Sequence, residues 1–431
     1  MQIRQLFRPA NNLIFCLSGR KSSIFFCLHS AKYLQSMSWR YILCFQMKYP
    51  RRYRLPEIRL GEYFMQKKLE NICSHFHIYG DYVVAIPCGK GHINDTYQVT
   101  FDQGGTLLHY TLQKINTNVF RQPALVMENF NCVTNHILSK IRQEKTQRGR
   151  AKRRTLRLVF THDAMPYYKD SDGDYWRCYV FVENCHSFDV LDEPDQAYKA
   201  AQAFGQFQLD LADLPDRLNE TIPYFHHAPR RFQALENMIK ADRFDRVKLV
   251  APEIDFVMKR AHELDKLIKL QQSGDIVERT THNDTKLNNV LIDDFTGEGI
   301  CVLDLDTVMP GLPHYDFGDM VRTGTSPAPE DETDLSKVYM RFDMFEALLR
   351  GYLDKAGMFL NDTEKELLPF SGKLITMVIG IRFLTDYLDG DNYFKTSRVN
   401  HNLERARSQF KLVESIEEQY DDMMKLLKEL K

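Results

Sequence analysis

Short β-rich stretches, one of which (residues 97–101) alternates between apolar and polar, mark the first part of the chain. They lie at residues 82–86, 97–101, 107–114 and 176–183. A period of two is typical of strands with one buried face, and Gly104-Gly105 marks a turn between two of them. Between these strands, apolar residues recur at helical spacing at Val126, Phe130, Val133 and Ile137. The pattern predicts a small sheet-based lobe with one helix at residues 65–185.

Helical spacing takes over in residues 186–431. Apolar or small side chains recur every three to four positions at Ala197, Ala200, Phe204, Phe207, Leu211 and Leu214, and Gly205 on the same stretch would permit close helix approach. Further helical patterns cover residues 254–270, 340–356, 367–388 and 403–431. The fold class predicted from these patterns is α+β, with a mostly helical second lobe.

Residues 1–64 differ from both lobes. No Asp or Glu occurs before residue 57, whereas ten Lys and Arg do. A transit peptide or a membrane-surface arm has such a composition. The simpler interpretation is an upstream start codon, with Met47 or Met65 opening the folded chain, and we expect this extension to be poorly ordered or a mis-assigned start.

The composition indicates which cellular compartment and which kinds of binding partner to expect. The 57 basic and 58 acidic residues nearly cancel, and none of the nine cysteines has CxxC spacing. These features argue against a disulfide framework or a zinc site and suit a reducing cytoplasm.

We find no apolar run near the roughly 18 residues of a spanning helix. The basic run 140–157 lacks interleaved aromatic residues and is interpreted as a solvated loop. We expect no nucleic-acid, membrane or obligatory protein partner.

The residues that suggest a catalytic reaction lie on a predicted loop at residues 281–289 and on the hairpin after it. His282, Asp284 and Asn289 have the spacing H-x-D-x-x-x-x-N, and Asp304 ends the second strand of a hairpin predicted at 290–304. This is the protein-kinase arrangement of a catalytic loop followed by a metal-binding aspartate. A carboxylate can take the proton of an acceptor hydroxyl, and oxygen ligands can hold Mg²⁺ against the phosphates of ATP.

Each residue also has a purely structural interpretation. Asp284 could cap a helix and Asn289 could belong to a turn. His282 is expected to be buried and to brace the loop rather than act as a base. Asp306 competes with Asp304 for the metal role, and we favour Asp304 because it directly follows the apolar run.

The predicted nucleotide-binding site includes a glycine turn, Gly89-Lys90-Gly91, whose N–H groups could approach phosphates. A hairpin turn without a ligand is an equal alternative. Lys114 ends the third predicted strand and could reach the α- and β-phosphates, and Glu128 on the next helix could pair with it. Either charge could instead be a solvated surface group.

With these residues assembled, the chain resembles the aminoglycoside phosphotransferase-like kinases over about residues 65–420. Within that family it is most similar to the N-acetylhexosamine 1-kinases. The stretches that carry the resemblance are GKGHINDTY from Gly89, LQKIN from Leu112, HNDTKLNN from His282, VLDLDTVMPG from Val302 and YDFGDMVR from Tyr315. The resemblance implies a protein-kinase-like two-lobe fold, with a small antiparallel-sheet N-lobe, and ATP and Mg²⁺ as cofactors.

The resemblance also implies roles for single residues. Asp284 would be the catalytic base, Asn289 and Asp304 the Mg²⁺ ligands, and Lys114 the phosphate-binding lysine. Backbone groups of Glu183 and Asn184 would hold adenine, and Arg382 and Tyr393 would contact the sugar. The implied activity is ATP-dependent phosphorylation of the 1-position of N-acetylglucosamine or N-acetylgalactosamine.

Three points stay open at this stage. The acceptor could instead be homoserine, choline or an aminoglycoside, or the chain could be a non-catalytic, pseudokinase-type nucleotide-binding protein. Arg382 and Asp386 could simply form an i,i+4 helix pair. We further expect Asp316 and Asp319 to support the site, with Asp319 holding the catalytic loop through its backbone N–H groups.

Overall fold

A computed structural model describes residues 60–88, 93–143, 153–188 and 191–430. The predicted extension, apart from residues 60–64, lies outside these ranges, as do Gly89, Gly91 and residues 144–152 of the basic run. The chain divides into two units after Leu69, inside helix α2 (Leu60–Cys73). The unit from Glu70 onward carries all the remaining elements, and the description below concerns that unit.

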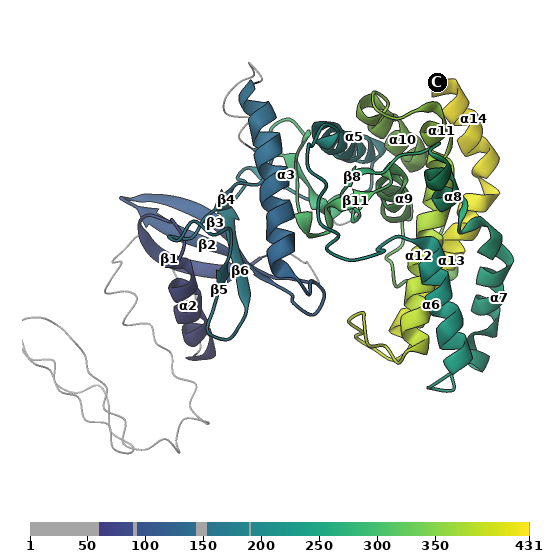
Figure 1. Ribbon diagram of the computed structural model, residues 1–431, viewed down its shortest axis with the longest axis horizontal. Coiled ribbons are helices and arrows are strands. Elements are labelled where there is room, and N and C mark those ends of the chain that lie inside the picture. Colours follow the sequence, from purple (N-terminus) through teal and green to yellow (C-terminus); the bar gives the residue numbers. More distant parts are fainter. Residues whose placement is uncertain (1–59, 89–92, 144–152, 189–190, 431) are drawn as a thin grey trace, which may run out of the picture. The chain divides into compact units, whose positions relative to one another are not determined.

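A six-stranded antiparallel sheet forms the first half of this unit (Figure 1). Its strands run in the order β1 (Asp81–Pro87), β2 (Asp95–Gln103), β3 (Thr106–Ile115), β6 (Tyr175–Val180) and β4 (Leu158–Val159), and β5 (Tyr168–Lys169) also pairs with β6. Three side chains from neighbouring strands, Val99, Leu112 and Cys178, are fully buried on one face. The β-rich stretches therefore predicted β1, β2, β3 and β6, and the structure confirms these strands.

Helix α3 (Pro123–Gln143) buries the apolar stripe that the sequence predicted. Val126, Phe130, Val133 and Ile137 are all at most 2% exposed and belong to the same apolar cluster as residues of the following helices. One continuous core thus joins α3 to the catalytic half of the chain.

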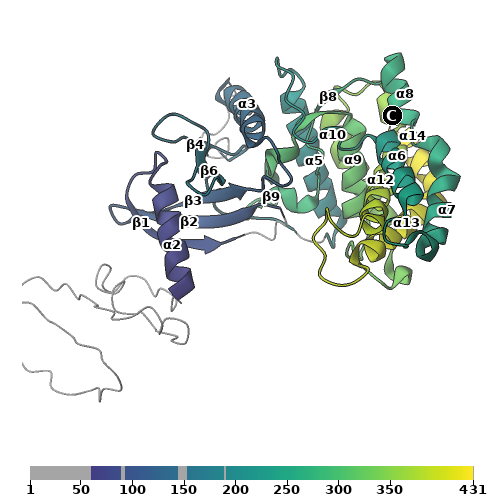
Figure 2. The same ribbon diagram turned by 60° about the horizontal axis from the view of Figure 1, so that its bottom comes forward.

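Helices dominate the rest of the unit (Figure 2). The longest are α5 (Pro194–Leu211), α10 (Phe342–Ala356), α12 (Leu368–Leu388) and α13 (His401–Glu418). Helices α5 and α10 approach closely because both carry glycine at the crossing. A Cβ on Gly205 would lie 2.9 Å from the carbonyl oxygen of Tyr352, and one on Gly351 would collide with that of Tyr198. Small residues thus allow the close approach that the sequence suggested.

Other helical predictions need correction. The pattern at 254–270 forms two helices, α7 (Ala251–Arg260) and α8 (Lys266–Ser273), and the last one divides into α13 and α14 (Tyr420–Leu430). Helices α6 (Ala228–Ala241), α9 (Pro313–Gly324) and α11 (Asp362–Glu366) were not predicted. All but one of the twelve residues of helix α9 are buried, so its polar side chains, Asp316 and Asp319 among them, lie inside the protein instead of on a solvent-exposed face.

The expectation that no segment is long and apolar enough for a membrane span was wrong for α12. This 21-residue helix meets that test by length and composition, but 83% of its apolar window is buried inside the protein. It packs against α9 and α13. Such burial is what a core helix shows.

Short strands and turns complete the fold and position the catalytic segments. Strands β9 (Val290–Asp293) and β10 (Gly299–Val302) form the predicted hairpin, and β7 (Cys185–His186) pairs with β9. Strand β8 (Arg279–Thr281) pairs with β11 (Met309–Gly311). Short 3₁₀ turns fill the remaining gaps at Val247–Val250, Ala261–Glu263, Leu287–Asn289, Leu305–Thr307 and Leu335–Lys337.

Candidate active site

The β8–β11 ladder brings the two chemically important segments together. Thr281 lies opposite Met309, so the loop that follows β8 and the segment that precedes β11 leave the ladder at the same end. The first segment carries Asp284 and Asn289, and the second carries Asp304 and Asp306. Residues that are about twenty positions apart in sequence therefore share one site.

Asp284 and Asn289 contact each other directly. The Asn289 amide nitrogen donates 2.9 Å to the backbone carbonyl oxygen of Asp284 and lies 3.4 Å from its carboxylate. Lys286 Nζ lies 3.2 Å from the same carboxylate. Because the amide nitrogen of Asn289 is engaged, its side-chain oxygen is the atom left to accept or to ligate.

His282 braces this loop, as predicted. Its side chain is fully buried, its Nε2 donates to the carbonyl oxygen of Leu303 at 2.7 Å, and its ring lies between Phe204 and Phe207. His282 thereby ties its loop to residues 303–307 at two points. Its ring donates to Leu303, and its backbone oxygen accepts from the Thr307 hydroxyl at 2.8 Å.

Asp316, at the start of α9, holds the loop by its backbone. Its carboxylate accepts the N–H groups of His282 at 2.9 Å and Asn283 at 2.7 Å, and also the amide of Gln208. Asn283 adopts a left-handed backbone (φ 64°), which turns both N–H groups toward this one carboxylate. The assignment of this role to Asp319 was wrong: Asp319 accepts instead from Arg322 Nε at 2.7 Å.

Asp304 and Asp306 differ in their partners. Asp304 has a left-handed backbone (φ 53°) and is half-buried, and its carboxylate has no hydrogen-bond or ion-pair partner among the described residues. Asp306 is 1% exposed and forms an ion pair with the equally buried Arg177 of β6. Its other oxygen accepts from the side-chain amide of Asn94 at 2.7 Å. Of the two aspartates, only Asp304 keeps its oxygens available for a ligand.

The closeness of these carboxylates changes their pKa values. Burial raises the pKa of Asp304 to about 6, and the nearby charges of Asp306 and Asp284 add to the shift. Burial would also raise the pKa of Asp284, but Lys286, with His282 and Arg322, brings it below its ordinary value. Asp284 is therefore ionised near neutral pH, as a proton acceptor must be.

The donor set suits a hard divalent cation. Carboxylate and amide oxygens are the ligands that Mg²⁺ prefers, and Asn289 and Asp304 offer one of each beside a concentration of negative charge. The side-chain oxygens of these two residues fit the predicted metal, and the partnered Asp306 does not.

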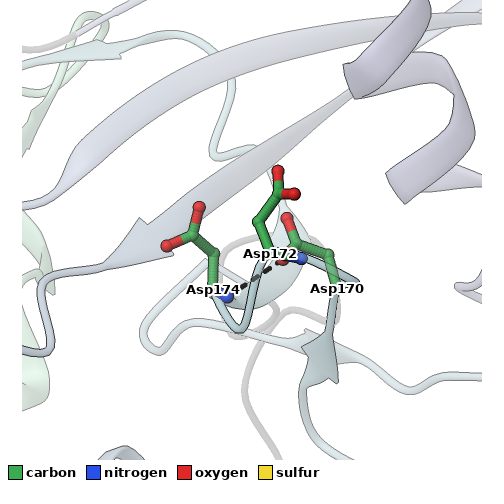
Figure 3. A group of neighbouring side chains, drawn as sticks. All are labelled: Asp170, Asp172 and Asp174. Carbon is green, nitrogen blue, oxygen red and sulfur yellow. Dashed lines mark hydrogen bonds between the residues drawn. The ribbon is translucent and has the colours of Figure 1, made fainter.

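Lys114 on β3 does not form the predicted pair with Glu128 in this structure. Its ammonium lies 2.6 Å from Asp174, and Glu128 accepts a hydrogen bond of 3.1 Å from Asn219. Asp174 belongs to the acidic turn between β5 and β6 (Figure 3), where Asp170 Oδ1 accepts the N–H groups of Asp172 and Asp174 at 2.9 Å. The turn brings three carboxylates within 4.8 Å of one another, so it attracts the nearby lysine.

Glu183 and Asn184 lie between β6 and β7, where the chain passes from the sheet to the hairpin of β9 and β10. Asn184 has φ 55°, and its carbonyl oxygen accepts the N–H of Asp294 at 3.1 Å. Arg153 donates to the carbonyl oxygen of Glu183 at 3.1 Å. An adenine contact by these backbone groups stays a prediction.

Arg382 and Tyr393 do lie near each other. The guanidinium of Arg382 is 5.8 Å from the Tyr393 ring centre, and Tyr393 is 55% exposed. The alternative i,i+4 pair of Arg382 with Asp386 is wrong. Asp386 is buried and accepts the backbone N–H groups of Asn392, Tyr393 and Phe394 and the amide of Asn402, at 2.8 to 3.0 Å. Asp386 thus shapes the loop that carries Tyr393.

Sequence reasoning missed two residues that the structure brings to this site: Arg177 and Asn94, which hold Asp306. Asp316 was expected to support the site, but its hold on the loop backbone was assigned to Asp319. Arg177 gave one available signal: a charged residue inside an otherwise apolar strand requires a buried partner. Nothing in the spacing identified that partner, because it lies 129 residues later.

Comparison with known proteins agrees with this geometry. A model of the phosphotransferase enzyme family (APH) matches residues 84–343, more than half of the chain. The structure is similar to that of an aminoglycoside phosphotransferase from Alicyclobacillus acidocaldarius subsp. acidocaldarius DSM 446, with a TM-score of 0.51 and 14% identity over 86% of this chain and 99% of that one. A choline kinase from Cryptosporidium parvum Iowa II matches with a TM-score of 0.45 and 15% identity, over 84% and 96% of the two chains.

The likeness to the first of these structures confirms the kinase-like fold, with its antiparallel-sheet N-lobe and helical C-lobe. The family match identifies the catalytic class: transfer of a phosphoryl group to a hydroxyl of a small molecule. The chain therefore belongs to the phosphotransferase enzyme family.

Proposed function

We propose that this phosphotransferase is an ATP-dependent kinase of the 1-position (anomeric) hydroxyl of N-acetylhexosamines. The observation that carries the proposal is the meeting of Asp284, Asn289 and Asp304 at one end of the β8–β11 ladder, where the Asp304 carboxylate has no partner among the described residues. A proton acceptor beside two oxygen ligands is the minimum that phosphoryl transfer to a hydroxyl requires.

In the proposed reaction, the anomeric hydroxyl donates a hydrogen bond to Asp284. Its oxygen forms a bond to the γ-phosphorus while the bond from that phosphorus to the β–γ bridging oxygen breaks. The hydroxyl proton passes to Asp284, and ADP departs with the bonding electron pair. Asn289 and Asp304 would hold Mg²⁺, which neutralises phosphate charge when bound. An anomeric hydroxyl is more acidic than an ordinary alcohol, so one carboxylate gives sufficient assistance.

On the nucleotide side, we propose that Lys114 contacts the α- and β-phosphates. The 2.6 Å contact supports Asp174, rather than Glu128, as the carboxylate that orients this lysine. Glu183 and Asn184 would present backbone groups to adenine.

On the acceptor side, the approach of Arg382 to Tyr393 supports the assignment of both residues to the sugar. The same arginine opposes a cationic acceptor such as choline or an aminoglycoside. Intact Lys114, Asp284, Asn289 and Asp304 argue against a non-catalytic nucleotide-binding role. We propose a cytoplasmic enzyme that needs no nucleic acid, membrane or protein partner.

The test is ATP consumption in the presence of Mg²⁺ with an acceptor panel, followed by phosphorus NMR of the product. The panel contains N-acetylglucosamine, N-acetylgalactosamine, glucose, galactose, homoserine, choline and kanamycin. We expect a sugar 1-phosphate from the two acetylated hexosamines. A phosphorylated product from another acceptor alone would remove the sugar assignment, and no turnover with any acceptor would favour a non-catalytic role.

A further inference from the structure

Two arginines from different helices meet at Phe225. Arg231 of α6 donates from Nε and Nη2 to the carbonyl oxygen of Phe225, at 3.0 and 2.9 Å. Arg382 of α12 lies over the ring of the same residue, 4.8 Å from its centre. Both side chains are half-buried. Both guanidinium groups therefore contact Phe225 and lie close to each other.

Neither guanidinium has an acidic partner in the part of the chain that the structure describes. The other neighbours of Arg382 are aromatic, with Tyr393 and Phe394 at 5.8 and 5.4 Å from ring centre to guanidinium. The acid nearest to Arg382 on its helix, Asp386, directs its oxygens to N–H groups. Burial and repulsion from Arg382 lower the pKa of Arg231 to about 10, which is consistent with two uncompensated charges close together.

The arginine pair is linked to the proton acceptor through the residue after Phe225. His226 Nε2 donates 2.8 Å to the carbonyl oxygen of Asn283, which directly precedes Asp284. His226 is 3% exposed, and its Nδ1 has no hydrogen-bond partner. A buried polar atom without a partner is expensive unless a ligand or water satisfies it. Phe225, His226 and Asn283 therefore connect the positive pair to the residue that precedes Asp284.

We propose that Arg231 and Arg382 together bind an oxygen-bearing substituent of the acceptor, an amide carbonyl or a carboxylate, and exclude acceptors that are cationic at that position. Arg231 is a specificity-determining residue in this arrangement. Two half-buried guanidiniums gain charge-assisted hydrogen bonds from such an oxygen, whereas an ammonium group meets repulsion from both. The inference rests on the proposed function, whose acetamido sugars carry such a carbonyl beside the reacting hydroxyl.

The experiment measures acceptor binding by calorimetry with the full-length protein, Mg²⁺ and a non-hydrolysable ATP analogue. The probes are N-acetylglucosamine, glucosamine, glucuronate and kanamycin. We expect N-acetylglucosamine to bind about tenfold or more tightly than glucosamine, with no binding of kanamycin. Glucuronate, whose carboxylate is on carbon 6 and not beside the anomeric hydroxyl, should not share this advantage. Arg231→Met should weaken N-acetylglucosamine binding about tenfold or more and reduce its advantage over glucosamine.

Arg230→Met is the matched control, because Arg230 is the preceding residue on α6 and its exposed guanidinium lies 3.7 Å from the ring centre of Tyr224. It should bind every probe as the wild type does. Arg382→Met provides a second variant, and thermal melting verifies that each variant is folded.

Binding and turnover separate the two claims. Selective binding of the acetylated sugar without turnover would support this inference and remove the proposed function. Equal or tighter binding of glucosamine or kanamycin, no binding of any probe, or equal effects of Arg231→Met on all probes would overturn the inference, even if the protein proved to be an active kinase.

Discussion

The side-chain amide of Asn94 donates a 2.7 Å hydrogen bond to Asp306, which lies 212 residues later in the chain. The other atom of that amide, Oδ1, accepts the backbone N–H of Asn116 at 3.0 Å. Asn94 directly precedes strand β2, so the bond connects the sheet to the segment that carries Asp304. Together with the buried pair of Arg177 and Asp306, it fixes one end of the candidate metal site.

Asp306→Asn should destabilise the protein by about 3 kcal/mol, because Arg177 would keep its charge in a buried site without a counter-charge. Urea unfolding measures the change. The double variant Arg177→Met with Asp306→Leu should recover most of that loss, since it removes both charges. Wild-type stability of Asp306→Asn would show that the pair is not important for folding.

Asp284→Asn should reduce kcat by about 10²- to 10⁴-fold, because an amide cannot accept the hydroxyl proton. Binding of a non-hydrolysable ATP analogue should remain close to wild type, since Asp284 faces the acceptor. Asp163→Asn, which alters an exposed aspartate outside the site, is the control for removal of a negative charge. A kcat near the wild-type value in Asp284→Asn would exclude this residue as the base.

Asp304→Asn should raise the Mg²⁺ concentration needed for half-maximal activity by about tenfold or more, because a carboxylate ligand becomes a neutral amide. Without Mg²⁺ its stability should equal or exceed that of the wild type, since the change relieves repulsion from Asp284 and Asp306. Titration of activity with Mg²⁺ and thermal melting test the two parts. Asp306→Asn provides the comparison, because its effect on stability has the opposite sign.

Asp316→Ala should cost about 3 kcal/mol or more of stability and lower kcat. The change leaves the N–H groups of His282 and Asn283 and the amide of Gln208 without their acceptor. Asp319→Ala should cost less, since Arg322 keeps its 2.7 Å pair with Glu330. Chemical denaturation of the two variants side by side measures the difference, and a larger loss in Asp319→Ala would reverse the roles given to these residues.

Acid should destabilise the fold through His314, which is fully buried and donates from Nε2 to the carbonyl oxygen of Glu364 at 2.9 Å. Burial lowers its pKa from 6.5 to about 4. The unfolded state therefore binds a proton that the folded state does not, and stability present above the unfolded pKa is lost as the pH falls toward about 4.

The expected loss is on the order of 3 kcal/mol once the pH reaches the folded pKa. In His314→Gln, which keeps a donor for Glu364, the decline in unfolding free energy over the same pH interval should be correspondingly smaller. An identical decline in both proteins would assign the acid sensitivity to other groups.

Local pattern was sufficient for the elements that alternate or repeat cleanly. The β-rich runs of β1, β2 and β3, the apolar arms of the β9–β10 hairpin and the apolar stripe of helix α3 are all visible in the sequence. The spacing of Asp284 and Asn289 was similarly informative, because one loop carries both. Helix α9 was not predicted, and its polar residues are buried with its apolar ones, unlike those of a surface helix.

Contacts between segments far apart in the chain could not be predicted from local sequence patterns. Asp316 and Asp319 occupy successive turns of α9 and have the same chemistry, and only the packing of α9 decides which one faces the loop. Likewise, Asp174 and Glu128 were both possible partners for Lys114, and the register of β3 with β6, which pairs Lys114 with Trp176, brings Asp174 near. Such choices depend on long-range register, which a single sequence does not state.

The buried position of α12 has a consequence for how the chain is made. Synthesis proceeds from the N-terminus, so this apolar helix is complete before the residues of α13, which cover it, have been added. For that interval the nascent chain exposes a surface suited to chaperones or to aggregation. A chain that terminates between Gly390 and His401 would keep that surface permanently, and premature stops there should yield insoluble protein although every catalytic-loop residue is already present.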